Sequence, residues 1–232
     1  MPADIPDIPG LLAAAIQTGQ GLSALSPGSC ATALGLDSLT LCLLDQSGLE
    51  LVWYDPDDSA AIAFEDLQYT LGEGPTLDAA RTGELVLVPD LHTVPEHRWP
   101  ALLAAAQQKL PSAAHAVPLN LGAVRIGVLT GHRSIPGPLT RAQMGALLAL
   151  AEGATMILTT PDGIHDMSSN NPLPLHRALI HQATGALTVL LDIPLSEALA
   201  RLRAYAFTHN LPLLDVAHDV VHHQANLDNP PS

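Results

Sequence analysis

The stretch YTLGEGPTLDAARTGELVLVPDL, residues 69 to 91, contains the most specific local pattern of the chain. Gly72 and Gly74 flank an acidic residue ahead of Pro75, which suits a tight loop with positive φ angles that leads into a short helix. A phosphate-binding loop would need Lys followed by Ser or Thr after its glycines, and a dinucleotide-binding loop would need a third spaced glycine. The stretch has neither, so it is not a nucleotide-binding motif of either kind.

Segments rich in β-forming residues lie on both sides of this stretch. Five of them are predicted to be strands: residues 38–45, 49–55, 84–91, 113–120 and 124–133. The first two flank a short Gly-containing connection of the hairpin type, which favours antiparallel neighbours. Helices are predicted at residues 8–21, 98–110 and 139–159. Strands in the middle with helices at both ends indicate an α+β fold.

At these residues the chain resembles a GAF domain of the kind found in actinobacterial regulators. The resemblance lies in TLGEGPTLDAARTGELVLVPDL, in RWPALLAAAQQ and in AVPLNLGAVRIGVLTGHR followed by GPLTRAQ, and it covers most of residues 8 to 158. It implies a central antiparallel sheet flanked by helices, with a small molecule held on one sheet face in many members. Relatives often carry Cys where Thr76 stands, so thiol-based sensing is not expected at that position.

The residues of this block limit what it could hold. Aromatic residues make up only 3% of the chain, so a pocket would be lined mainly by aliphatic side chains, which favours a small apolar ligand or none. His92, His97 and His115 do not have the spacing of ligands on one helix face. His218 and His222 in the C-terminal block have it, but no third ligand is evident. No metal and no cofactor is therefore predicted.

The overall composition excludes several classes of function. The 9 basic residues against 23 acidic ones give a net charge of -14, which argues against broad attraction to phosphate backbones or anionic membranes. The 2 cysteines are too few for a disulfide framework. Neither a signal peptide nor a run of about 18 apolar residues is present, so a cytoplasmic protein without a membrane partner is predicted. The chain has no G-x-S-x-G motif and no paired carboxylates that stand out, so no enzymatic activity is predicted.

A linker divides the chain into two domains. The stretch TTPDGIHDMSSNNPLP concentrates Pro, Gly, Ser, Asn and Asp between two apolar periodic regions. The sequence therefore predicts a sensor domain at residues 1–158, a linker at 159–174, a helical domain at 175–226 and a disordered tail at 227–232.

Apolar periodicity predicts three short helices in the second domain. The first ends near Leu191, and its apolar face comprises Leu175, Leu179, Ala183, Ala186 and Leu190. The second runs from about Leu195 to His209, with Leu195, Ala198, Leu199, Leu202, Tyr205 and Ala206 inward. The third has Asn210 as its N-cap candidate and Pro212 in its first turn, and it buries Leu213, Val216, Ala217, Val220 and Val221.

Small residues interrupt the first of these helices in IHQATGAL, residues 180 to 187. An interior Gly costs a helix about 1 kcal/mol relative to Ala, so the weakness at Gly185 calls for a compensating interaction. One stripe of the helix comprises Ala178, Gln182, Gly185 and Val189. Its lack of bulk allows close approach by a packed helix or by a ligand backbone, and both explanations remain open. Gln182 and Thr184 add hydrogen-bonding groups that packing does not require, which favours a recognition surface.

HRALIHQATGALTVLLDIPLSEALARLRAYAFTHNLPLLDVAHDVV, residues 176 to 221, resembles an ANTAR domain, the three-helix RNA-binding output module of bacterial antitermination regulators. The resemblance runs through QATG in the first helix, SEALARLRAYA in the second and LLDVAHDVV in the third. It implies a dimer that binds hairpin loops in nascent mRNA and prevents terminator formation. The RNA-binding residues implied by the resemblance are Arg177, His181, Gln182, Ala183, Thr184, Gly185, Arg201 and Arg203.

The charge of this block departs from that of its relatives. Many relatives carry Lys where Thr184 stands, and the chain from His165 onward has 3 Arg against 6 acidic residues. RNA binding draws much of its affinity from neutralised phosphates, so weak binding or a strong dependence on dimerisation is expected.

These observations together predict a homodimeric regulator whose GAF-like sensor controls an RNA-binding antitermination domain through the helix at 139–158. The alternative keeps both folds but gives the C-terminal helices a role in dimerisation or protein docking without RNA.

Overall fold

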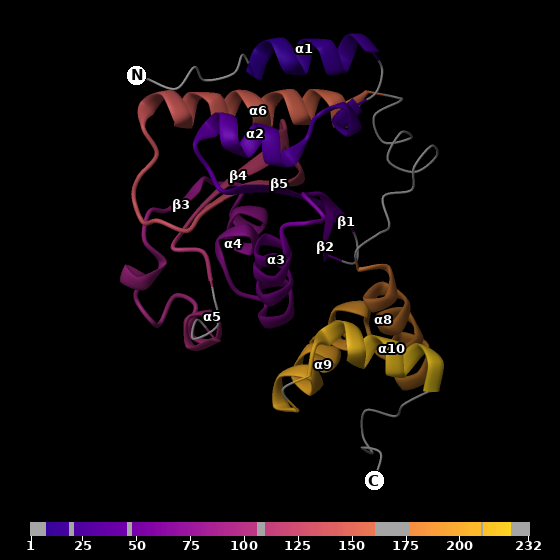
Figure 1. The fold of residues 1–232 in the computed structure, drawn as a ribbon. Coiled ribbons are helices and arrows are strands. Elements are labelled where there is room, and N and C mark those ends of the chain that lie inside the picture. The colour runs from indigo at the N-terminus through magenta and orange to yellow at the C-terminus, as the bar shows by residue number, and fades with distance from the viewer. Residues whose placement is uncertain are drawn as a thin grey trace.

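A five-stranded antiparallel sheet forms the centre of the molecule in a computed structural model of the chain. The structure describes residues 8–18, 21–45, 48–105, 110–160, 177–209 and 211–223. Its strands are β1 (Ser38–Asp45), β2 (Gly48–Trp53), β3 (Val86–Val88), β4 (Ala113–Leu121) and β5 (Val124–Arg133). The spatial order is β2-β1-β5-β4-β3, and each neighbouring pair is antiparallel (Figure 1). The predicted α+β class and the predicted hairpin between the first two strands are confirmed.

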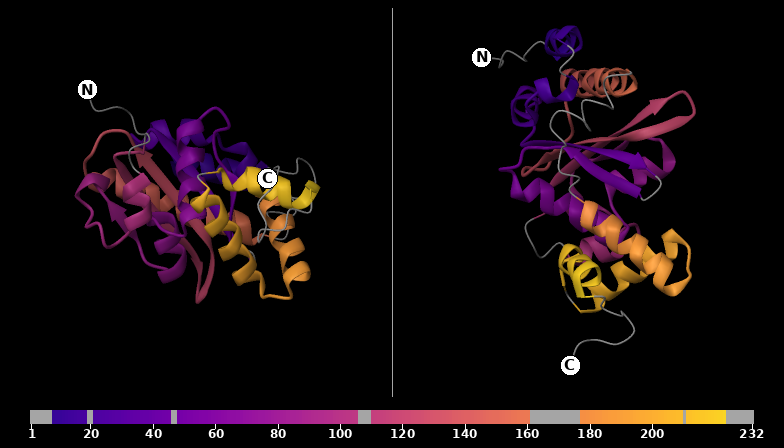
Figure 2. Two further views of the ribbon diagram at one scale, coloured as in Figure 1. Left: turned by 90° about the horizontal axis from the view of Figure 1, so that it is seen from below. Right: turned by 90° about the vertical axis from the view of Figure 1, so that its right-hand side faces the viewer.

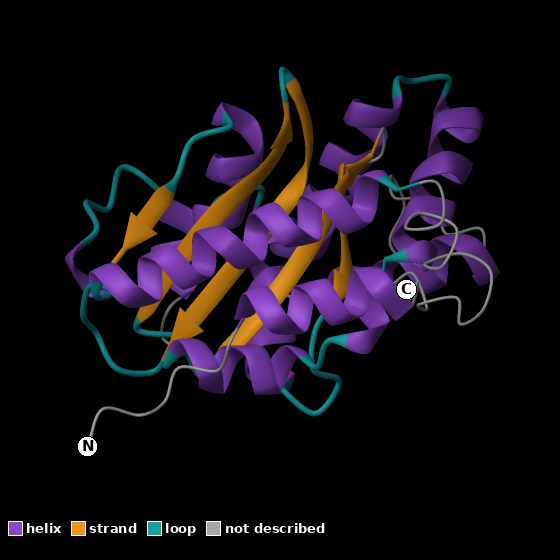
Figure 3. Ribbon diagram, turned by 90° about the horizontal axis from the view of Figure 1, so that it is seen from above, coloured by secondary structure: helices purple, strands orange, loops and turns teal. Residues whose placement is uncertain are grey.

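Helices cover both faces of this sheet. On one face lie α1 (Ile8–Thr18), the 3-10 turn η1 (Gly21–Ala24), α2 (Pro27–Leu34) and α6 (Arg141–Thr159), and Figure 3 shows helices lying over the strands. On the other face lie α3 (Ser59–Leu71), α4 (Pro75–Thr82) and α5 (Pro100–Ala105), with the short turn η2 (Leu91–Thr93) after β3. The C-terminal helices α8 (Ala178–Leu191), α9 (Leu195–Thr208) and α10 (Leu213–His223) pack on this second side (Figure 2), where α9 contacts α3.

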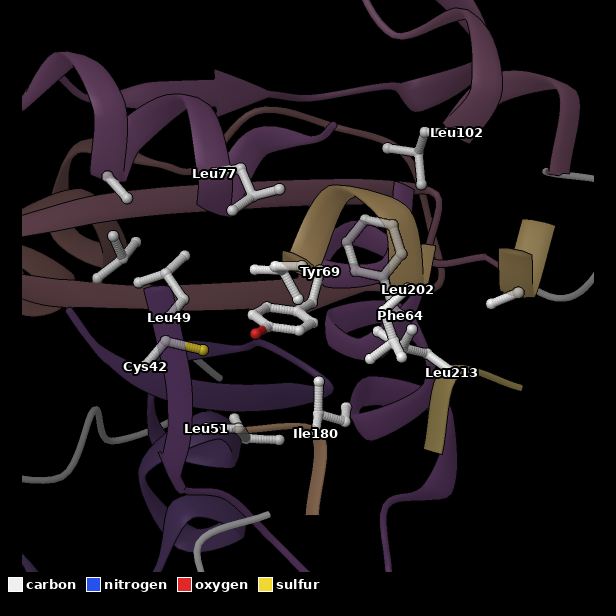
Figure 4. Packing of buried hydrophobic residues seen from close by; sticks show 14 of the residues in the cluster. Cys42, Leu49, Leu51, Phe64, Tyr69, Leu77, Leu102, Ile180, Leu202 and Leu213 are labelled. Carbon is white, nitrogen blue, oxygen red and sulfur yellow. The ribbon is translucent and has the colours of Figure 1, made fainter. Parts of the chain in front are cut away.

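Each face of the sheet buries its own hydrophobic core because successive strand residues point to opposite sides. Leu39, Leu41 and Leu129 pack with α1, α2 and α6. Cys42 and Val128 belong to the opposite core, which also contains buried residues of α8, α9 and α10. Figure 4 shows Tyr69, Ile180, Leu202 and Leu213 within that second core. The C-terminal helices therefore share a hydrophobic core with the sheet domain.

The structure differs from the sequence-based expectations in three respects. Two helices, α2 and α3, lie in segments for which no helix was predicted. The strand predicted at 84–91 is only three residues long, because Leu91 already begins η2 and Pro89 has no backbone N–H to give to a strand partner. The helix predicted at 98–110 spans Pro100–Ala105 in the described chain, and residues 106–109 lie outside it.

The helix α6 is long and apolar enough to cross a membrane by length and composition, and α8 with α9 would qualify only as one span bent by 111°. In the molecule α6 packs against the sheet with Leu147, Leu150 and Ile157 buried. A capping box of Thr140 and Gln143 begins the helix. These features are those of a core helix in a folded domain.

His115 on β4 is a buried polar residue without a hydrogen-bond partner for either ring nitrogen among the described residues. Burial, together with the charges of Arg133 and His132, lowers the pKa of His115 from 6.5 to about 4. His115 therefore takes up a proton at a higher pH in the unfolded chain than in the folded chain. The free energy of unfolding is expected to fall as the pH drops from about 6.5 to about 4. Above about pH 6.5 His115 is neutral in both states, so it makes the free energy of unfolding no further dependent on pH.

Replacing His115 with Leu should remove this acid sensitivity. Between pH 7 and pH 4.5 the wild type should lose about 2 kcal/mol more than His115→Leu in urea unfolding, because one pKa unit corresponds to about 1.4 kcal/mol. His97→Leu is the matched control, since His97 is exposed. Equal losses in the wild type and in His115→Leu would contradict the assignment.

Candidate functional site

The GEGP loop, residues 72–75, connects α3 to α4 and contacts the beginning of α5. Gly72 and Gly74 have φ angles of 71° and 130°, and α4 begins at Pro75, so the predicted loop and short helix are confirmed. The Glu73 carboxylate accepts hydrogen bonds from the backbone N–H groups of Ala101 and Leu102, at 2.9 and 3.2 Å. These contacts satisfy donors at the start of α5, so the acidic residue of the motif stabilises a helix terminus.

A buried polar network lies between α3 and the sheet. The hydroxyl groups of Thr40 and Thr76 each donate to Glu65 Oε1 at 3.0 Å, and His132 Nε2 lies 3.2 Å from the same oxygen. Gln68 Oε1 accepts the Thr76 backbone N–H at 2.9 Å. We call Thr40, Glu65, Gln68, Thr76 and His132 the Glu65 cluster.

The Glu65 cluster was missed by sequence analysis, which expected an aliphatic lining. Its residues come from β1, α3, α4 and β5, and all of them are buried. Thr76, which stands where relatives often carry Cys, serves this network as both donor and acceptor. The arrangement gives the sheet face a hydrogen-bonding centre that a polar ligand group could replace.

A second feature is a cavity of about 710 Å³ between α3, α5 and the connection from α9 to α10. Its volume lies in the range of small-molecule sites, which often occur at domain interfaces. Most of its lining is apolar and includes Leu67, Leu71, Phe207 and Leu213. The described chain thus provides space for a small molecule at the contact between its two domains.

The three predicted C-terminal helices are confirmed, but the buried face of the first differs from the prediction. Ala186 is exposed, Leu190 is 60% exposed, and Leu175 lies outside the described residues. The buried residues of α8 are Ile180, Ala183, Thr184 and Leu187. Thr184 can enter the core because its hydroxyl donates to the Ile180 carbonyl at 2.7 Å. Asn210, the predicted N-cap of the third helix, also lies outside the described residues.

The stripe around Gly185 faces open space. A Cβ atom built at Gly185 would meet nothing within 4 Å, Gln182 is exposed, and Val189 is 85% exposed. No described helix of this chain packs there, so packing within the chain does not explain the glycine. The stripe is accessible from outside the molecule.

Arg177 lies in a socket formed by β2 and α3. Its guanidinium donates to the carbonyls of Leu49 at 2.7 Å and Glu65 at 3.1 Å, and to Asp66 Oδ1 at 3.1 Å. Its backbone N–H donates to Glu50 Oε1 at 2.8 Å. Only 1% of Arg177 is exposed. We call Leu49, Glu50, Glu65, Asp66 and Tyr69 the Arg177 socket.

Two further basic residues contact the same socket. His181 Nε2 lies 2.7 Å from Glu50 Oε2. The guanidinium carbons of Arg177 and Arg203 lie 4.2 and 4.6 Å from the centroid of the Tyr69 ring, distances typical of cation–π contacts. Burial lowers the pKa of Arg203 from its ordinary value.

The residues predicted to bind RNA therefore occupy three different environments. Arg177, His181 and Arg203 contact the sheet domain. Their predicted contacts with RNA would require a conformation in which this interface is open. Ala183 and Thr184 are buried in the three-helix core, so in this conformation they support the surface from beneath. Three members are accessible: Gln182 and Arg201 are exposed, Gly185 is partly exposed, and Arg201 pairs with Glu197 at 2.9 Å.

The histidines that were considered as metal ligands do not gather into a site in the described part of the chain. The rings of His218 and His222 lie 4.4 Å apart on the outer side of α10, as their spacing predicted. Within the described residues, no group of three His, Cys, Asp or Glu side chains could hold a metal ion.

Comparisons with known proteins agree with these two structural units. The family model of the GAF domain matches residues 15–159, and that of the ANTAR domain matches residues 175–221. A comparison with curated protein sequences finds no match.

Among solved structures, the chain is similar to the GAF domain of an Acinetobacter phosphoenolpyruvate-protein phosphotransferase. The two sequences are 16% identical, the match covers 70% of this chain and 95% of that chain, and the TM-score is 0.46. It is also similar to free methionine-R-sulfoxide reductase from Neisseria meningitidis, with 19% identity, coverage of 64% and 84%, and a TM-score of 0.45. The family matches carry the assignment: the chain belongs to the GAF domain family and joins this sensor domain to a C-terminal ANTAR domain, as GAF-ANTAR regulators do.

Proposed function

We propose that the protein is a cytoplasmic, non-enzymatic regulator that binds hairpin loops in nascent mRNA through its ANTAR domain and promotes transcription antitermination. The GAF domain senses a small molecule and controls this output. The observation that carries the proposal is the open stripe at Gln182, Gly185 and Val189, where an RNA backbone can approach α8 closely. The matched ANTAR family supplies the RNA-binding class.

A second candidate function rests on the apolar part of the same surface. Val189, on the same stripe as Gly185, is 85% exposed, and Leu190, the next residue along α8, is 60% exposed. Exposed aliphatic side chains favour contact with protein over contact with RNA. In this alternative the three helices serve dimerisation or protein docking without RNA.

Substituting Gly185 with Leu separates the two functions. The added side chain has room in the fold and leaves the charge unchanged, but it blocks close approach of a backbone to α8. We expect the affinity for a labelled two-hairpin RNA at low salt to fall at least about tenfold, or about 1.4 kcal/mol. Gly145→Leu is the matched control, because Gly145 is also a helical glycine with open space around it. Equal, measurable RNA affinities of the two variants would contradict RNA contact at Gly185, and no RNA binding by the wild type at low salt would favour the protein-docking alternative.

The proposed regulator is a homodimer. Leu11 of α1 and Met156 of α6 are exposed on the outer layer of the GAF domain, so this layer has apolar surface that a second copy could cover. Light scattering at micromolar concentration should give twice the mass of one chain. A single-chain mass at that concentration would contradict the proposal.

A further inference from the structure

We infer that the GAF domain holds the ANTAR domain in an inactive state by occupying the cations that RNA would need. This inference rests on the proposed function and names its regulation. Three of the basic residues implied in RNA binding, Arg177, His181 and Arg203, contact the Arg177 socket. The GAF domain and the RNA phosphates therefore compete for the same side chains.

The Arg177 socket supplies oxygen acceptors to the two terminal guanidinium nitrogens of the arginine, as a phosphate group would, while its Nε has no hydrogen-bond partner among the described residues. Two carbonyl oxygens and one carboxylate accept from the guanidinium, while the ring of Tyr69 covers one of its faces. Because Arg177 stands directly before α8, anchoring it also fixes the beginning of the three-helix unit. Glu50 adds a second anchor one turn further on, since its two oxygens bind the Arg177 backbone and His181.

The remaining charges do not favour RNA in this docked state. The whole chain carries a net charge of -14, so binding must rely on locally placed cations. Among the arginines of the ANTAR domain only Arg201 is exposed, and it pairs with Glu197. Each phosphate contact that is lost weakens binding and reduces its salt dependence. The docked state is consequently a poor RNA binder, although the stripe at Gly185 stays open.

The helix α3 connects this interface to the interior of the sensor. Glu65 contributes its carboxylate to the Glu65 cluster and its backbone carbonyl to Arg177. Its neighbour Asp66 pairs with Arg177, and Tyr69 lies one turn later on the same helix. A ligand that displaces the Glu65 carboxylate would shift the socket residues with it. By linkage, a ligand that favours release must bind the released state more tightly, and RNA must then raise the affinity for that ligand.

The full-length double variant Glu50→Gln, Asp66→Asn tests this inference. Both substitutions keep the side-chain shape but remove the charges that hold Arg177 and His181. The control is Asp57→Asn, Glu96→Gln, which makes the same change in net charge at exposed positions outside the socket. We expect the socket variant to bind labelled two-hairpin RNA at low salt at least about tenfold more tightly than the control. Its radius of gyration from small-angle X-ray scattering should increase, and its far-UV circular dichroism should stay unchanged.

A third variant adds Arg177→Gln to the released double variant. The RNA affinity should then fall, and the salt dependence should decrease by about one phosphate contact. Equal RNA affinity of the wild type, the control and the socket variant would overturn the inference and leave the proposed function intact. RNA binding by none of them, with release of the socket variant seen in scattering, would overturn both.

Discussion

Replacing Glu65 with Ala is expected to lower the free energy of unfolding by about 3–5 kcal/mol, because each buried group left without its hydrogen-bond partner costs about 1–3 kcal/mol. The substitution leaves the hydroxyls of Thr40 and Thr76 without their acceptor and His132 without its facing carboxylate. All of these groups are shielded from water, which therefore cannot replace the carboxylate at no cost. Thermal unfolding followed by circular dichroism should show a Tm lower by roughly 10 °C.

Two variants define the limits of this effect. Glu96→Ala, at an exposed position, should change the free energy of unfolding by no more than about 0.5 kcal/mol. Glu65→Gln retains an oxygen that can accept from Thr40 or Thr76, so it should lose less than Glu65→Ala. If Glu65→Ala lost no more than Glu96→Ala, the Glu65 cluster would not be a stabilising network.

The same cluster explains why α3 could not be predicted from the sequence. Its segment SAAIAFEDLQYTL buries Glu65 and Gln68 together with Phe64 and Tyr69. Two polar residues on the buried side remove the contrast between an apolar and a polar face, which is the signal that predicts an amphipathic helix. The strands β1 and β5 were predictable because each contains a dense run of aliphatic residues buried between two layers of helices, although Thr40 and His132 lie on one face.

The candidate RNA surface was partly predictable. The lack of bulk at Gly185 identified the stripe, but only the structure shows that nothing in the described chain covers it. The position of Arg177 was not predictable, because its partner Glu50 lies 127 residues earlier in the chain. Periodicity reports which face of one helix is apolar, and it contains no information on contacts between segments so far apart.

Replacing Leu202 with Ala should unfold the ANTAR domain and leave the GAF domain folded. Leu202 of α9 is completely buried in the core that contains the buried residues of α8 and α10. Truncating such a leucine costs about 2–5 kcal/mol. A three-helix core of this size rarely supplies more than about 3–5 kcal/mol, so the loss is comparable with the whole stability of the domain.

Hydrogen exchange measured by mass spectrometry can resolve the two domains. In Leu202→Ala the peptides that cover α8, α9 and α10 should exchange rapidly, while those from β1, β4 and β5 should stay protected. Leu190→Ala on the exposed side of α8 is the control and should leave protection unchanged in both domains.

Loss of protection in the strands as well would mean that the two domains unfold as one cooperative unit. In that case the core that they share and the Arg177 socket would be strong enough to couple their stabilities. Release of the ANTAR domain would then require the GAF domain to change its own fold, and a small shift of α3 would not suffice. Separate unfolding instead requires the interface to be weaker than either core, which is the condition for a ligand to control docking.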